Sequence, residues 1–323
     1  MSFRRTILMG LALVVVAGGA EAGRRPPKRK RTSPAPALPP TAHRPAAPMA
    51  IRKIAPPTAA EIARNRATAM AWYEQARRDI NADLHLVEGP NFLIFSAWPR
   101  GADARLREVC ETMYTHLREK LAMPRAQPVW AGKLPVFTFE KVEDFRRFCG
   151  LVGEAGMRES GGFTMQRADG FCYVALNKVH TRTHFYGLLV HEGTHAFLAR
   201  YHTNGFLPEW VNEGLAELMS AELVPSCAAG ARYVSATAEA LRRGRDVSGI
   251  FREVTLGDFE YGVAQSLVRF LLARSGSDFV KFLKLLKIGM DPSEALEKSY
   301  GLTGEQLQAE WKLASRQALR RTR

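Results

Sequence analysis

Two histidines and a glutamate in the segment LLVHEGTHAFL, residues 188–198, have the types and spacing of a metal-dependent hydrolytic site. If this segment is a helix, His191 and His195 lie on one face, one turn apart, and can direct both imidazoles at a single ion. Glu192 then lies beside the open position of that ion, where a carboxylate can take a proton from water and pass it to a leaving amine. The pattern predicts a metallopeptidase site. The alternative is a buried helix containing these residues by chance, expected on the order of once in a hundred such sequences.

A second segment, LPEWVNEGLAELMS at 207–220, supplies the third ligand that a zinc site needs. It has a helical pattern, and the seventeen residues between His195 and Glu213 suffice to end the first helix and bring back an antiparallel partner. We predict Glu213 as the third ligand. Glu217, one turn later, is placed to accept the other ring N–H of a histidine ligand and to fix its tautomer. Two solvated glutamates on a surface helix are the alternative.

Other histidines lie close by in the sequence. His180 and His184 also stand four apart, and His202 follows His195 by seven residues. His180 and His184 lack a glutamate at the catalytic position, which favours surface or supporting positions over metal ligation.

The elements that must hold these residues form an α+β pattern. TAAE at 58–61 has capping-box spacing and predicts a helix from Thr58 to about residue 80. Strands are predicted at 91–97 and 134–139, with a helix over 102–122, a short helix ending near Gly150, and a hairpin over 161–176 that turns at 168–170. After Thr181 the pattern is helical, with helix starts marked by DPSE at 291–294 and TGEQ at 303–306.

The formal net charge of +14 is concentrated at the N-terminus: residues 1–53 contain eleven lysines and arginines against Glu21 alone. Residues 1–22 combine a basic start, an apolar run and Ala20-Glu21-Ala22, which predicts a secretory signal peptide cleaved after Ala22. The apolar run is short for a bilayer-spanning helix, which needs about 20 residues. Cleavage would leave no transmembrane segment; an uncleaved membrane anchor is the alternative.

Residues 23–57 hold ten of the eighteen prolines and no acidic residue, which predicts a basic, disordered linker. Because the chain is expected to be exported, contact with an envelope polyanion is favoured over specific nucleic-acid binding, and a solvated spacer is the simpler alternative. The folded domain is expected over 58–323, with an α/β part at about 58–180 and a helical part at about 181–323.

Export would also place four cysteines where disulfides can form. Three pairings are possible, and the sequence does not choose among them. Cys110 continues a helical apolar series, as a buried free cysteine would. The cysteines are Cys110, Cys149, Cys172 and Cys227.

HEGTH followed by PEWVNEGLAE resembles the gluzincin zinc metallopeptidases, in which a zinc helix precedes a glutamate helix. With YGVAQSLVRFL at 261–271, the chain more closely resembles the bacterial peptidase-MA-like domains, over roughly residues 85–315. The resemblance implies a zincin-like fold: a small mixed N-terminal sheet with helices, the two metal helices and an all-helical C-terminal part. It also implies one Zn²⁺ ion, Tyr261 as donor to the oxyanion, and a strand of the 161–176 hairpin that binds peptide by strand addition. The alternatives are an aromatic residue at a helix start that packs onto the core and an ordinary structural hairpin.

These observations lead to one expectation and one alternative. The expectation is an exported zinc-dependent metallopeptidase acting on a peptide or protein, with Glu192 as general base and acid. The alternative is a catalytically silent, zinc-stabilised binding or scaffold protein of the cell envelope, since a structural site needs only its ligands. No specificity pocket can be recognised in the sequence, which leaves endopeptidase and aminopeptidase activity, and protein and cell-wall peptide substrates, as open alternatives.

Overall fold

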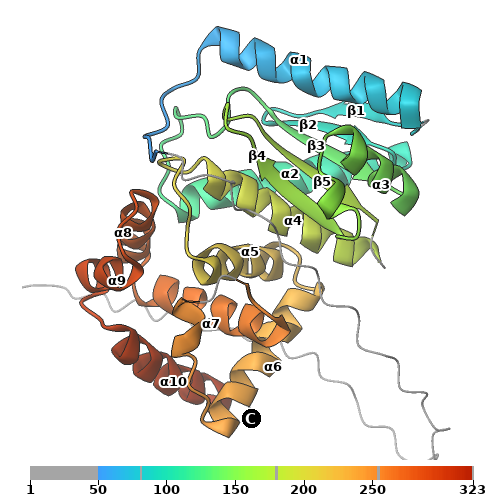
Figure 1. The fold of residues 1–323 in the computed structure, drawn as a ribbon. Coiled ribbons are helices and arrows are strands. Elements are labelled where there is room, and N and C mark those ends of the chain that lie inside the picture. The colour runs from blue at the N-terminus through green and yellow to red at the C-terminus, as the bar shows by residue number, and fades with distance from the viewer. Residues whose placement is uncertain (1–49, 81, 179–180, 253–254, 322–323) are drawn as a thin grey trace, which may run out of the picture.

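The computed structural model describes residues 50–80, 82–178, 181–252 and 255–321 (Figure 1). The signal peptide expected over 1–22 and residues 23–49 of the expected linker lie outside the described residues. Within the described ranges, no helix is both long enough and apolar enough to cross a membrane.

The described residues form five β-strands, ten α-helices and four short helical turns. The strands are β1 (His85–Glu88), β2 (Phe92–Ser96), β3 (Leu134–Phe139), β4 (Gly162–Gln166) and β5 (Cys172–Asn177). The helices are α1 (Ala59–Gln75), α2 (Asp103–Lys120), α3 (Val142–Leu151), α4 (Arg182–Ala199), α5 (Glu209–Leu223), α6 (Ala228–Arg243), α7 (Asp258–Arg274), α8 (Gly276–Lys287), α9 (Pro292–Tyr300) and α10 (Gly304–Arg321). The turns are η1 (Ala76–Ile80), a π-helix, and η2 (Arg100–Ala102), η3 (Ala155–Met157) and η4 (Ser248–Phe251), which are 3₁₀.

The strands form one mixed sheet in the order β1-β2-β3-β5-β4. The central pairs β2–β3 and β3–β5 are parallel, and the two outer pairs, β1–β2 and β4–β5, are antiparallel. The predicted 161–176 hairpin is present as β4 and β5, and Gly170 in its turn has a φ of 82°, which glycine adopts without strain. The sequence patterns did not predict β1, because its four residues are too few to show an alternation.

Side chains alternate across the sheet and divide the core into two clusters. In β3, Val136 packs into the core beneath α2 and α4, whereas its neighbour Phe137 packs into the opposite core beneath α1 and α3. The sheet is therefore covered on both faces, with α1 and α3 on one side and α2 and α4 on the other (Figure 1). The predicted mixed α+β fold, with a small mixed sheet and a largely helical remainder, is confirmed at this level.

The predicted helix starts have the expected capping contacts. The hydroxyl of Thr58 accepts from the N–H of Glu61, while the Glu61 carboxylate accepts from the N–H of Thr58, which makes a complete capping box at α1. Asp291 caps α9 ahead of Pro292. Thr303 and Gln306 exchange the same pair of hydrogen bonds at α10.

All described regular elements after β5 are helical, and α5 lies at the centre of this half, between α4 and α7 (Figure 1). Gly214 allows α5 to approach α7 closely: a Cβ atom there would lie 2.6 Å from the carbonyl oxygen of Ala264. This close approach fixes the position of α5, the helix that follows the predicted zinc helix.

The first described residues, 50–54, pair with the loop after α4. Lys53 forms an isolated antiparallel bridge with Thr203, and the N–H of Ile54 donates to the carbonyl of His202 at 3.1 Å. The side chain of Asn204 accepts from the N–H of Arg52 at 2.6 Å. The end of the segment expected to be disordered therefore has a defined backbone conformation, because the loop at 202–204 offers it hydrogen-bonding partners.

The four cysteines are free thiols buried in the core. Burial raises the pKa of Cys149 and of Cys172 to about 12. Neutral thiols of this kind act as small apolar side chains, as the sequence pattern around Cys110 indicated.

Candidate metal centre

Helix α4 brings His191 and His195 together as the four-residue spacing predicted. Their Nε2 atoms lie 3.0 Å apart, and both side chains are buried. The helix contacts the sheet and α2 on one side and α5 on the other. Its buried residues run without a break from Gly187 to Leu198, as expected for a helix enclosed on all sides. The surrounding core therefore fixes the direction of both imidazoles.

Glu213 on α5 completes a three-residue group. Its carboxylate oxygens lie 3.1 Å from Nε2 of His191 and 3.4 Å from Nε2 of His195, and its side chain is fully buried. Ligands at about 2.0–2.1 Å from a tetrahedral zinc ion are roughly 3.3 Å apart, which is close to these separations. Two imidazole nitrogens and a carboxylate also suit zinc chemically. The group could bind a metal ion.

The charges in this group favour a cation between the three side chains. Burial alone would raise the pKa of Glu213, but the neighbouring imidazoles of His195 and His191 hold that pKa well below its ordinary value. Burial would lower the pKa of His191, but its contacts with the Glu213 and Glu217 carboxylates raise that pKa well above the ordinary value. Protons therefore occupy the imidazoles readily, and a metal ion binding there has to displace them.

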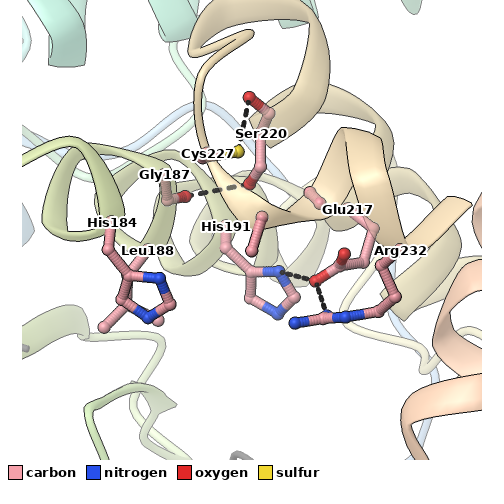
Figure 2. Close-up of a pocket in the computed structure, with 10 residues that line it drawn as sticks. His184, Gly187, Leu188, His191, Glu217, Ser220, Cys227 and Arg232 are labelled. Atoms are coloured by element: carbon pink, nitrogen blue, oxygen red, sulfur yellow. Dashed lines mark hydrogen bonds and ion pairs between the residues drawn. The ribbon is translucent and has the colours of Figure 1, made fainter. Parts of the chain in front are cut away.

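Glu217 lies on the far side of His191, as predicted from its place one turn after Glu213. Its Oε1 atom is 3.3 Å from Nδ1 of His191 (Figure 2). An Nδ1–H that donates to this carboxylate leaves the Nε2 lone pair facing His195 and Glu213. The tautomer that can bind a metal is thus the one this contact favours.

The sequence patterns missed Arg232 on α6, whose Nη1 atom lies 2.9 Å from the same Glu217 oxygen (Figure 2). Its guanidinium carbon also lies 5.8 Å from the ring centroid of Tyr261. The only signal in the sequence was indirect: a buried carboxylate such as Glu217 requires a cation, and α6 carries several arginines.

Glu192 is buried beside the histidines and is contacted by the edge strand β4. The hydroxyl of Thr164 lies 2.9 Å from Oε2 of Glu192 and 2.6 Å from its backbone carbonyl oxygen. Burial raises the pKa of Glu192 above its ordinary value, although His195 and His191 oppose the change. A carboxyl group whose pKa is raised in this way can both accept and return a proton near neutral pH.

Tyr261 on α7 is buried on the side of the site that faces α6. Burial raises its pKa, and the nearby carboxylates of Glu213 and Glu209 raise it further, so the hydroxyl stays protonated and can donate a hydrogen bond. Glu209, which the sequence patterns also missed, occupies the first turn of α5, four residues before Glu213. Burial and repulsion from Glu213 raise the pKa of Glu209 to about 7.

A small pocket of about 30 Å³ opens beside His191, lined by residues of α4, α5 and α6 (Figure 2). This volume has room for one or two water molecules. His184, expected at a surface or supporting position, lines the pocket, whereas His180 lies outside the described residues. His191 and Glu217 both line the pocket, so it adjoins the side of the site where these two residues contact each other.

The chain matches no family model. No curated protein matches it either. Mixed α+β folds host many chemistries, so the functional assignment depends on the side chains of the site itself.

Proposed function

We propose that the chain is an exported, zinc-dependent metallopeptidase of the gluzincin type, with a zincin-like fold. The observation that carries the proposal is the position of Glu192, a buried carboxylate adjoining three convergent side chains that suit a metal ion. A site that only stabilises the fold needs the ligands and has no use for a further buried carboxylate.

His191, His195 and Glu213 would hold the ion, with Glu217 as the hydrogen-bond partner of His191. A zinc ion bound there would polarise a peptide carbonyl and acidify a water molecule. Glu192 takes the proton from that water and later delivers it to the leaving amine. The protonated hydroxyl of Tyr261 donates to the developing oxyanion, a role of the kind worth about 3 kcal/mol.

The position of β4 at the edge of the sheet supports the proposal that the substrate is a peptide. Within the described part of the chain, β4 pairs only with β5, so its outer backbone groups are available to an extended peptide. Thr164 joins this strand to Glu192, so a peptide added to β4 would lie next to the catalytic carboxylate.

A zinc-stabilised scaffold protein of the cell envelope is the second candidate. The deep burial of all three candidate ligands favours it, because structural metal sites are closed to solvent. Under this proposal the ion would contribute to folding, so chelation would unfold the chain. The protein would hydrolyse no peptide with or without zinc.

The test uses the full chain, reconstituted with zinc, and a peptide library digested with and without chelator. We expect one zinc per chain and chelator-sensitive cleavage. Glu192→Gln should keep the zinc and lose hydrolysis, whereas His195→Ala should lose both. Less than about half an equivalent of zinc after reconstitution would contradict the proposal. Full zinc with no cleavage of any peptide would favour the scaffold.

A further inference from the structure

Three of the five large apolar side chains that are exposed in the described residues belong to segments that contact one another. Ile51, Phe206 and Ile288 are 46%, 49% and 50% exposed. They come from three segments far apart in the sequence: 50–54, the loop at 202–206, and the end of α8 at 284–289. We name this surface the three-segment face. Exposed aromatic and aliphatic residues gathered in this way mark an interaction site more often than a chance arrangement.

Backbone and side-chain contacts bring the three segments together. Lys53 bridges to Thr203, whose hydroxyl in turn donates to the carbonyl of Lys287. A Cβ atom on Gly289 would lie 2.7 Å from Cδ1 of Ile51. Gly205, which precedes Phe206, abuts the carbonyl of Lys287. The three segments therefore lie side by side, and each of them carries one of the exposed apolar residues.

The three-segment face is also positively charged. The three segments contain Arg52, Lys53, Lys284 and Lys287 and no aspartate or glutamate, and Lys287 is buried. Arg52, Lys53 and Lys284 are exposed among them. Burial and the positive charges of Lys284 and Lys53 lower the pKa of His202, in agreement with cations gathered around this loop. Asp291, the next acid along the chain, is occupied as the N-cap of α9.

The N-terminal arm joins the folded part at this same face. Residues 23–49 of the expected linker contain seven lysines and arginines and no acid. Polybasic segments are attracted to anionic lipid, and their effect adds to that of cations on the folded surface they adjoin. A soluble polyanion would use the charges alone and would gain nothing from Ile51, Phe206 and Ile288, whereas a bilayer interface accepts both groups.

We propose that the three-segment face docks on the surface of an anionic lipid bilayer, with Phe206 and the two isoleucines inserted among the headgroups and Arg52, Lys53 and Lys284 against the phosphates. The docking is peripheral. It is independent of peptidase activity, so its test neither requires nor checks the metal site.

The experiment places a polarity-sensitive dye on the full chain. Because the four native cysteines are buried, a cysteine introduced by Phe206→Cys can be labelled selectively. The matched control is Leu313→Cys on α10, an exposed apolar position, 58% exposed, outside the three segments. With vesicles of phosphatidylglycerol and phosphatidylcholine, we expect the emission of the label at 206 to shift to shorter wavelength, and that at 313 to stay unchanged. With phosphatidylcholine vesicles alone, neither label should respond.

Sedimentation with the same vesicles gives a second measurement. Combined Ile51→Ser, Phe206→Ser and Ile288→Ser substitutions should weaken binding to anionic vesicles by about tenfold, whereas Leu313→Ser should leave binding unchanged. A label at 206 that does not respond, or labels at 206 and 313 that respond equally, would overturn the proposal. Unchanged vesicle binding by the triple variant would overturn it as well, since the arm alone would then account for binding.

Discussion

Nη1 of Arg232 lies 2.9 Å from Oε1 of Glu217, the same oxygen that faces Nδ1 of His191 at 3.3 Å. The three side chains come from α6, α5 and α4, so the contact joins three helices behind the candidate metal site. The guanidinium of Arg232 donates to Oε1 of Glu217 and holds the carboxylate in place, so that the same oxygen can accept the Nδ1–H of His191. Arg232 therefore acts on the metal site through another residue, as a positioning residue.

Replacing Arg232 tests this role. Arg232→Met should weaken zinc binding by about 10- to 100-fold, as loss of an outer hydrogen-bonding partner of a metal ligand does. Arg232→Lys should restore part of the loss, because lysine supplies the charge without the planar fork. Competition with a chromophoric chelator measures the affinity. Arg243→Met is the control, since Arg243 lies on the same helix and pairs with Glu239 at the surface. Equal affinities of Arg232→Met and Arg243→Met would refute the role.

Thr164→Val should shift the pH dependence of peptide hydrolysis. The Thr164 hydroxyl stabilises the ionised form of Glu192, so its removal raises the pKa of that carboxyl. The acid limb of kcat/KM should move to higher pH while zinc content stays the same. Thr138→Val is the control: Thr138 is also buried in a strand, and its hydroxyl has no hydrogen-bond partner among the described residues. An unmoved acid limb in Thr164→Val would show that the hydroxyl does not act on Glu192.

Gly214→Ala should destabilise the protein. The added methyl carbon would lie 2.6 Å from the carbonyl oxygen of Ala264 and 2.8 Å from a methyl group of Val268, so α5 has to move away from α7. Overpacking of this kind costs about 1–3 kcal/mol of unfolding free energy. Because Glu213 is the adjacent residue, zinc affinity should fall too. Urea unfolding measures the loss of unfolding free energy. Gly276→Ala is the control: no atom lies within 4 Å of the added methyl carbon, so neither the unfolding free energy nor the zinc affinity should fall.

The buried amine of Lys287 predicts a pH-dependent stability. Its Nζ donates to the carbonyls of Leu198 and Ala199 at the end of α4, and burial lowers its pKa from 10.5 to about 7. Between pH 7 and 10.5 the unfolded chain holds a proton on this residue that the folded chain lacks. The contribution of Lys287 to the free energy of unfolding therefore rises with pH in that window, by up to about 1.4 kcal/mol per pH unit.

Lys287→Met isolates this contribution because the variant lacks the titrating amine. The difference in unfolding free energy between the unsubstituted protein and Lys287→Met should grow in favour of the unsubstituted protein from pH 7 to pH 9. Urea unfolding at pH 7, 8 and 9 gives the difference. A constant difference would mean that the amine has an ordinary pKa in the folded protein.

Local patterns predicted the parts of the fold that local chemistry determines. The capping boxes at Thr58 and Thr303 and the strand at 134–139 are present where the sequence placed them. His191 and His195 converge because their spacing matches the helical repeat, and Glu213 reaches them because the intervening loop has the length to return an antiparallel helix.

The missed features depend on tertiary packing. Arg232 meets Glu217 only because α6 packs against α5, and an arginine near a helix start otherwise resembles any solvated cation. The pairing of residues 50–54 was missed for a similar reason: proline-rich composition predicts disorder, and the partner at 202–204 lies about 150 residues further along the chain.

That pairing also determines how the molecule would respond to mechanical load. A pull on the chain ahead of Ala50 reaches the Lys53–Thr203 bridge before it reaches α1 or the sheet. The bridge partner lies on the connection between α4 and α5, the two helices that carry His195 and Glu213. While the bridge holds, tension applied ahead of Ala50 is transmitted to this connection and, through α4, to the packing of that helix on the sheet.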